Sequence, residues 1–327
     1  MRHFEIFNLS EDVTKMKNLT VFVATIIGMT FWISIASGAD YKDVRNNGLE
    51  QIALKNAIAT IQIAEAIEEF KRYSVGYIVS IGVLSTGVDE SMPGLKGRVL
   101  PGASFVKHEP DIIDRNGSGT YNAALIAAIA PNARILPIKI LDNIGLGAIS
   151  LVAKGIHFGV ERGAKILLIP GATATRSNPG LQEAVARARQ KGILLISPAG
   201  NRRSIEQYYP GAFKEVLAVG TTDAWDRKTA FSNFGDWVSL FAPWVDIKSI
   251  YSGSRLRSLP ESNPEAAIVA GVAALVLGIN PDLGADGVEE ILLSTATDIS
   301  SKNPEMGVGA RRVNALAAVR AAKVWDR

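Results

Sequence analysis

From Tyr77 to the C-terminus, short apolar runs alternate along the chain with segments of helical periodicity. An apolar run with no polar alternation is typical of a strand buried on both faces, and such strands occur in parallel sheets that helices cover on both sides. The alternation therefore predicts an α/β fold of three layers, with a central, mostly parallel sheet and helices on both faces. At 327 residues, of which 47% are hydrophobic, the chain is long enough to bury one such core.

The boundaries of these elements follow from where each pattern begins and ends. We expect strands over residues 77–84, 135–141, 166–169, 193–197 and 216–219. We expect helices over residues 122–129, 149–162, 181–191, 265–277, 287–296 and 313–324. Two further short strands are expected between Trp237 and Ile250. No internal repeat or low-complexity linker interrupts the pattern, so residues 76–327 are expected to form one domain.

The N-terminal region has the features of an export signal. A charge-free stretch from Leu19 to Ala39 follows two lysines and ends in Ser-Gly-Ala, which places small residues at the −3 and −1 positions of a signal-peptidase site. The apolar part of this stretch also just reaches the lower limit for spanning a bilayer. Residues 1–39 are therefore expected to be a signal peptide or an N-terminal membrane anchor. Both alternatives place residues 40–327 outside the cytoplasm, secreted, periplasmic or at the cell surface.

One amphipathic helix separates this segment from the first expected strand. Apolar residues recur at helical spacing over residues 46–72, with charged residues between them. The chain thus divides into residues 1–39, a short N-terminal helical segment over residues 40–75, and a main domain over residues 76–327.

Composition excludes several classes of function. The net charge is only +3 and the chain has no basic stripe, which argues against a nucleic-acid partner. The chain has no cysteine, which excludes disulfides, a thiolate nucleophile and cysteine-ligated metal sites. No motif implies a cofactor or a metal. The histidine and the carboxylates within residues 107–114 suit either a cation site or a solvated loop, and we favour the loop.

Three short motifs follow one another along the main domain. Val83-Leu84-Ser85-Thr86-Gly87 ends the first expected strand, Asn116-Gly117-Ser118-Gly119-Thr120 precedes a helix, and Glu261-Ser262-Asn263-Pro264 precedes Val269-Ala270-Gly271. Together with Ser197-Pro198-Ala199-Gly200-Asn201, they resemble the motifs of the subtilisin-like serine protease family (subtilase, peptidase S8). The resemblance extends from Tyr77 to the C-terminus and implies a subtilisin-like fold.

The resemblance also implies which positions carry the chemistry in this family. Ser85 corresponds to the acid of the Asp-His-Ser triad, Ser118 to the base and Asn263 to the nucleophile. Asn201 corresponds to the residue whose side chain donates to the oxyanion in active members. We therefore interpret the chain as a degenerate member in which no catalytic residue remains and Asn201 is a retained oxyanion-type residue.

Several of these residues also have ordinary structural interpretations. Asn263, or the adjacent Ser262, suits capping of the helix that is expected to follow it. Asn201 suits a role in which its own amide bonds hold an irregular loop. The histidines of the chain lie outside the three motifs and are expected to be surface or packing residues: His3, His108 and His157.

Two functions from different classes follow from this interpretation. The first is an exported, catalytically inactive subtilase homologue, a pseudoprotease that binds an unknown protein or peptide partner or acts as a scaffold. The alternative is a serine-type endopeptidase of the same family with a rearranged, non-standard active site. Membrane attachment through Leu19 to Ala39 is compatible with both.

Overall fold

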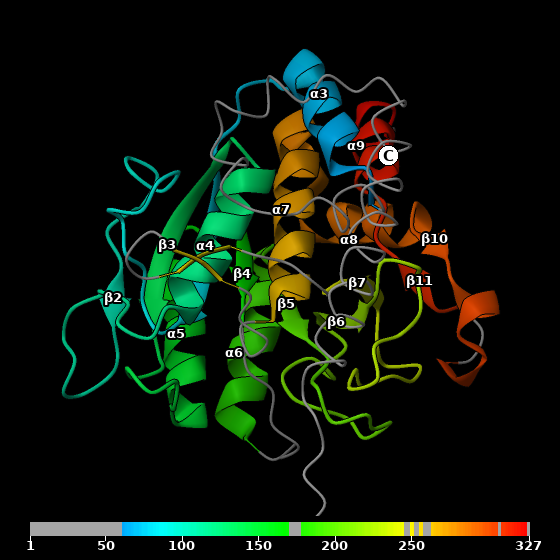
Figure 1. The fold of residues 1–327 in the computed structure, drawn as a ribbon. Coiled ribbons are helices and arrows are strands. Elements are labelled where there is room, and N and C mark those ends of the chain that lie inside the picture. The colour runs from blue at the N-terminus through cyan, green and yellow to red at the C-terminus, as the bar shows by residue number, and fades with distance from the viewer. Residues whose placement is uncertain are drawn as a thin grey trace, which may run out of the picture. The chain divides into compact units, whose positions relative to one another are not determined.

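The computed structural model describes residues 61–169, 178–244, 249–251, 255–257, 263–306 and 309–325 (Figure 1). The expected export segment, residues 40–60 and Ser262 lie outside these ranges.

The centre of the described domain is a nine-stranded sheet with the strand order β10-β11-β7-β6-β5-β4-β1-β3-β2. Its strands are β1 (Val79–Ser85), β2 (Ala103–Ser104), β3 (Ala133–Lys139), β4 (Ile166–Leu168), β5 (Leu194–Pro198), β6 (Val216–Thr222), β7 (Leu240–Pro243), β10 (Thr297–Asp298) and β11 (Arg311–Arg312). Every pairing is parallel except that of β10 with β11. A separate antiparallel hairpin joins β8 (Ser249–Tyr251) to β9 (Arg255–Arg257).

Helices cover both faces of the sheet (Figure 1). The helices are α3 (Ile63–Tyr73), α4 (Ser118–Ile129), α5 (Ile149–Glu161), α6 (Pro179–Gln190), α7 (Pro264–Ile279), α8 (Gly284–Ser294) and α9 (Ala315–Lys323), with short 3-10 turns η5 (Pro281–Leu283), η6 (Ser300–Lys302) and η7 (Pro304–Met306). Helices α5 and α6 pack on one face, and α3, α4, α7, α8 and α9 pack on the other.

Alternation of side chains along the strands divides the core into two layers. On β1, Ile81 and Val83 join the core under α4 and α7, whereas Leu84 joins the core under α5 and α6. Successive strand residues point to opposite faces, so a strand between two helical layers is buried at nearly every position. The structure therefore confirms the predicted three-layer fold.

Helix α7 is the central helix of its layer. All of its residues are buried, from Pro264 to Ile279. It packs closely against α4, because a Cβ added at Gly271 would lie 2.8 Å from Cβ of Ile129.

In the described part of the chain, no single helix is long and apolar enough to cross a membrane. Helix α7 and the following η5–α8 segment (Pro281–Ser294) are long and apolar enough when taken together, but the pair is bent by 108°.

The N-terminal helical segment packs into this same core. Helix α3 begins at Ile63, within the predicted range, and buries Phe70 against Gly278 near the end of α7. Glu69 of α3 accepts a hydrogen bond from Lys323 of α9 at 3.0 Å. Helix α3 thus contacts the C-terminal ends of α7 and α9.

Arg98 fixes the C-terminal end of α4. Its guanidinium donates to the carbonyl oxygen of Ala127 at 2.7 Å and also to those of Ala130 and Ala133. Helix C-termini leave carbonyl groups without intrahelical partners, and Arg98 satisfies them here. Burial lowers the pKa of Arg98 to about 10.

Candidate functional site

The end of β1 meets the N-terminus of α4 where the first two motifs lie. A Cβ added at Gly119 would lie 1.9 Å from the carbonyl oxygen of Gly87 and 3.2 Å from Cβ of Ser85. Only glycine allows this approach, which brings the first turn of α4 against the turn after β1. Ser85 and Ser118 are therefore neighbours, although they lie far apart in the sequence.

The two serines have different environments. Ser85 is fully buried, and its hydroxyl oxygen has no hydrogen-bond partner among the described residues. Ser118 is the first residue of α4 and is partly exposed. Neither hydroxyl group carries a charge. The two serines therefore lack the proton-accepting ability of a carboxylate and an imidazole.

Asp114 holds the N-terminus of α4, a role that the sequence did not reveal. Its carboxylate accepts from the backbone N–H groups of Gly117 at 2.7 Å and Thr120 at 2.8 Å, and from Oγ1 of Thr86 at 2.8 Å. Oγ1 of Thr86 in turn accepts from the N–H of Gly119 at 3.1 Å. A carboxylate that accepts hydrogen bonds from the free N–H groups of a first helical turn is a favourable cap. The sequence signal that could have predicted this cap is an acidic residue shortly before the helix.

Asn263 stands at the N-terminus of α7 in an unusual conformation. Its φ is 53° and its ψ is 58°, the left-handed region, and its side chain makes no capping hydrogen bond to the helix. Instead, Nδ2 of Asn201 donates to Oδ1 of Asn263 at 3.4 Å. The expectation that Asn263 caps the helix is therefore wrong, because a left-handed residue does not adopt the extended backbone of a regular N-cap.

The loop that carries Asn201 is held by a different asparagine. Buried Asn233 accepts at Oδ1 from the N–H groups of Arg202 at 2.9 Å and Ser204 at 3.0 Å, and its Nδ2 donates to the carbonyl oxygen of Ala199 at 3.0 Å. Asn201 is exposed, and among the described residues its side chain bonds only to Asn263. The expectation that Asn201 holds the loop by its own amide bonds is wrong, and Asn233 has that role.

A buried carboxyl group lies two residues beyond Asn263. Glu265 is fully buried, and neither of its carboxylate oxygens has a hydrogen-bond partner in the described part of the chain. Burial raises the pKa of this group to about 8. Burial and the charge of Glu265 together raise the pKa of Tyr121 on α4 above its usual range. This burial could not be predicted from the sequence, because an acid in the first turn of a helix is normally solvated.

The remaining acids and histidines have other roles. In the loop of residues 107–114, Glu109 forms an ion pair of 2.8 Å with buried Lys139, which lowers the pKa of Glu109, and Asp111 pairs with Arg115 at 2.8 Å. His108 is exposed, and His157 lies on α5, on the opposite face of the sheet from α4. The structure shows no group of three or more His, Cys, Asp or Glu residues that could hold a metal ion within its described ranges.

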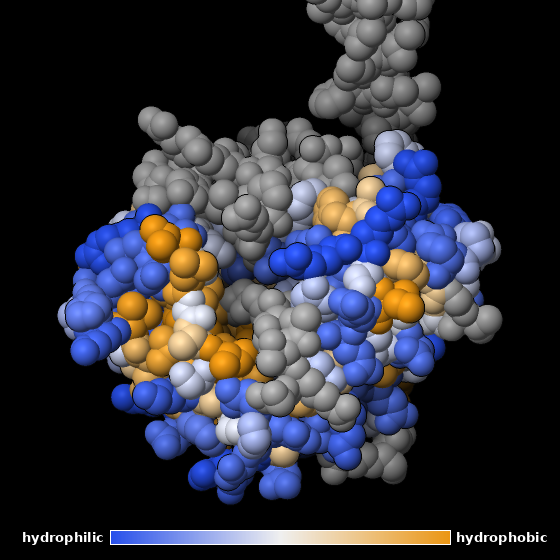
Figure 2. All heavy atoms as spheres, turned by 90° about the horizontal axis from the view of Figure 1, so that it is seen from below, coloured by the Kyte–Doolittle hydropathy of each residue, from blue (hydrophilic) through white to orange (hydrophobic). Residues whose placement is uncertain are grey.

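Apolar side chains also reach the surface around the loops that carry the site. Ile113 is 49% exposed, and Ile144 and Leu146, which follow β3, are 74% and 65% exposed. A hydrogen bond of 3.3 Å from Nδ2 of Asn116 to the carbonyl oxygen of Asn143 joins these two loops. Figure 2 shows apolar surface on the end of the molecule at which α4 and α7 begin.

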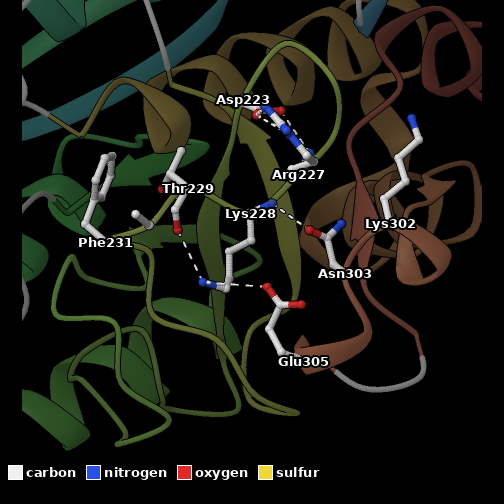
Figure 3. A pocket seen from close by; sticks show the side chains of 9 residues that line it. Asp223, Arg227, Lys228, Thr229, Phe231, Lys302, Asn303 and Glu305 are labelled. Atoms are coloured by element: carbon white, nitrogen blue, oxygen red, sulfur yellow. Dashed lines mark hydrogen bonds and ion pairs between the residues drawn. The ribbon is translucent and has the colours of Figure 1, made fainter.

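A depression of about 540 Å³ lies between the loop after β6 and the turns η6 and η7 (Figure 3). Its charged groups are paired: Arg227 with Asp223 at 2.8 Å, and Lys228 with Glu305 at 3.9 Å. Lys302 also lines it and pairs with Asp226 at 3.0 Å, so each of its charged groups has a partner of opposite charge.

Comparison with known proteins agrees with the resemblance of the motifs. The profile of the subtilase family, Peptidase_S8, matches residues 76–310. The chain belongs to the subtilase family. It is 34% identical over 273 residues to subtilisin BL of Lederbergia lenta, covering 80% of this chain and 97% of that protein.

Two further relatives extend this result. The thermophilic serine proteinase of Bacillus sp. (strain AK1) is 34% identical over 251 residues, which cover 73% of this subtilase and 61% of that proteinase. A cold-adapted subtilisin-like serine proteinase of known structure superposes with a TM-score of 0.68 at 28% identity, covering 74% of this chain and 90% of the other. The subtilisin-like fold is therefore shared with proteins named as proteinases.

Proposed function

We propose that this subtilase is an inactive homologue that binds a protein or peptide, or scaffolds an assembly, without hydrolysing it. The proposal takes Ser85, Ser118 and Asn263 as the family's acid, base and nucleophile positions. An activated nucleophile needs a hydroxyl or thiol beside a base, and an asparagine amide is neither.

The observation that carries the proposal is the contact between Asn263 and Asn201. The amide of Asn201, the group that would donate to an oxyanion, donates to Oδ1 of Asn263 at 3.4 Å. The two side chains are thus in hydrogen-bond contact at the start of α7. The described histidines lie on neither α4 nor α7, because His108 lies in an exposed loop and His157 lies on α5, across the sheet.

The names of the relatives favour the alternative, a serine-type endopeptidase with a rearranged active site. Those relatives are called proteinases or subtilisins, and the match covers most of this chain. A rearranged site would need a base other than histidine. Glu265 is the candidate that the structure offers, because its carboxyl group is buried near the start of α7 and its pKa of about 8 is close to neutral.

We further propose export of the main domain, with residues 19–39 as a cleaved signal or a retained anchor. The partner is expected to be a protein or peptide, and the exposed Ile113, Ile144 and Leu146 supply apolar contact surface for it.

A fluorophosphonate probe separates the two functions. We expect no stoichiometric labelling of the full chain, because the inactive homologue has no activated serine. Stoichiometric labelling of one serine, mapped by mass spectrometry, would support the endopeptidase. Its matched variant, Ser262→Ala or Ser118→Ala according to the labelled residue, would then abolish both labelling and peptide cleavage.

A further inference from the structure

A tryptophan is exposed on the turn that follows β6. Trp225 is 68% exposed and lies in the turn from Asp223 to Arg227. Tryptophan carries a large apolar ring system, and its exposure on a folded domain marks a candidate contact surface when polar groups surround it. A single exposed apolar residue is also common on protein surfaces, so the surroundings of Trp225 decide whether it can bind a ligand.

The carboxylate of Asp223 fixes the turn that presents this indole. One of its oxygens accepts from the N–H groups of Trp225 at 2.8 Å and Arg227 at 2.9 Å. The other accepts from Nε of Arg227 at 2.8 Å, and the N–H of Asp223 itself donates to the carbonyl oxygen of Arg227 at 2.8 Å. The backbone on both sides of Trp225 is therefore held before any ligand arrives.

The tip of the same turn is anchored to the C-terminal part of the domain. Asp226 is buried and adopts a positive φ of 67°. Its carboxylate pairs with Lys302 of η6 at 3.0 Å, and its carbonyl oxygen accepts from Nδ2 of Asn303 at 2.7 Å. With Asp226 turned inward, Trp225 beside it is left at the surface. A surface that is ordered in advance loses less conformational entropy when it binds, so the turn suits recognition.

One face of the indole is already covered. The guanidinium carbon of Arg227 lies 5.0 Å from the centroid of the Trp225 ring, a cation–π distance. Since the side chain is nevertheless 68% exposed, the face away from Arg227 is the one that a ligand can cover. The π face of an aromatic ring carries partial negative charge and attracts hydrogen atoms that carry partial positive charge.

Arg227 also links the indole to the depression in Figure 3, because it lines that depression. Trp225 therefore stands at the rim. The volume of about 540 Å³ is within the range of sites that bind small molecules. The other lining residues are mostly polar: Asp223, Lys228, Thr229, Ala230, Phe231, Lys302, Asn303 and Glu305.

This lining favours a neutral ligand that both donates and accepts hydrogen bonds. Each ionised group has a partner of opposite charge, so a charged ligand would have to compete with an existing pair. The half-exposed side chains of Lys302 and Glu305 supply a donor and an acceptor at the surface. A hydroxyl group uses both, whereas a proline-rich peptide, another neutral ligand of aromatic grooves, presents carbonyl acceptors and few N–H donors.

We propose that Trp225 and the depression together bind a neutral oligosaccharide of β-linked, glucose-configured rings. In such a ring every hydroxyl is equatorial, so both faces present only C–H hydrogens, which carry partial positive charge and suit the negative face of the indole. The hydroxyls at the edge of the ring are left for the donors and acceptors of the depression. The site uses none of the motif positions Ser85, Ser118 and Asn263, so it does not depend on whether the chain hydrolyses peptides.

The test is calorimetric titration of the purified full chain with cellotetraose, a neutral β-linked glucose tetramer, together with saturation-transfer NMR. We expect saturable binding, with the strongest transfer to the C–H hydrogens of the sugar rings. Trp225→Ala should raise Kd at least about tenfold, the loss expected when an aromatic anchor is removed, and Trp225→Phe should raise it less. Tyr73→Ala, which removes a 47% exposed aromatic ring from α3, is the matched control and should leave Kd unchanged.

A charged probe tests the paired lining. A tetramer of β-linked glucuronic acid has the same ring faces and carries a carboxylate on each ring. It should bind more weakly than cellotetraose, because the cations of the depression are already paired. Thermal unfolding should give the same Tm for Trp225→Ala and the wild type, since this side chain is exposed, so a change in Kd reports the site and not the fold.

Three outcomes would overturn the proposal. The first is no binding of cellotetraose, or equal Kd values for the wild type and Trp225→Ala. The second is stronger binding of the acidic tetramer, because the depression would then select an anion. The third is capture of a protein that Trp225→Ala no longer captures, without any binding of cellotetraose, which would assign this surface to a protein contact.

Discussion

Glu265 is predicted to make the stability of the domain fall as pH rises. In the unfolded chain its pKa is near the reference value of 4.5, and burial raises it to about 8 in the folded protein. The folded state therefore binds this proton more tightly than the unfolded state. The resulting stability is fully present below pH 4.5 and is lost as pH rises through about 8.

The magnitude follows from the two pKa values. Their difference corresponds to about 5 kcal/mol of unfolding free energy, lost at about 1.4 kcal/mol for each pH unit between them. A loss of this size is comparable with the whole stability of many domains. Glu265→Gln keeps the shape of the side chain and cannot ionise, so it should remove this slope and make the variant more stable than the wild type above neutral pH.

Urea unfolding at several pH values between 5 and 8 measures the slope directly. The chain has no cysteine, so thiol oxidation does not complicate the comparison. Glu290→Gln, at an exposed position on α8, is the matched control and should leave the pH dependence unchanged. An equal pH dependence in the wild type and in Glu265→Gln would refute the reasoning.

Three further predictions concern groups that hold the loops and helices around the site. Arg98→Met should cost about 2–4 kcal/mol of unfolding free energy, because it removes the hydrogen bonds from the guanidinium group to the carbonyl oxygens at the end of α4, and an unchanged urea midpoint would contradict that role. Asn233→Ala should cost about 1–3 kcal/mol and Asn201→Ala less than about 0.5 kcal/mol, and a reversed order in thermal unfolding would show that Asn201 holds the loop after all. Glu109→Ala should lower Tm more than Lys139→Met does, because it leaves the fully buried ammonium group of Lys139 without its carboxylate, and equal Tm values would argue against the ion pair.

Much of the fold was predictable, since the strands of its central sheet are buried on both faces. Residues 79–85 and 133–139 are mostly apolar, because nearly every side chain of these strands is buried. The strands β2, β10 and β11 were missed because two residues show no periodicity. Helix α4 begins at Ser118, before its predicted start at residue 122, because Asp114 caps a polar first turn.

The sequence motifs identified the residues of the candidate site but did not predict the geometry of those residues. The motifs identified Ser85, Ser118 and Asn263 as candidate positions. The preference of asparagine for helix caps depends on residue type alone, so it did not predict the positive φ of Asn263. Likewise, an acid at the start of a helix is normally exposed. The burial of Glu265 depends on α4 packing over it, which is a tertiary contact that no local pattern encodes.

The central claim is that the positions of Ser85, Ser118 and Asn263 no longer support peptide hydrolysis. The most direct measurement is turnover of a peptide substrate by the wild type and by the triple variant Ser85→Asp, Ser118→His, Asn263→Ser. In subtilisin, removal of the whole triad costs about 10⁶-fold in turnover, and its members act as a unit. The account predicts no turnover above background for the wild type and a gain of several orders of magnitude for the triple variant. Turnover by the wild type that the triple variant does not increase would contradict it.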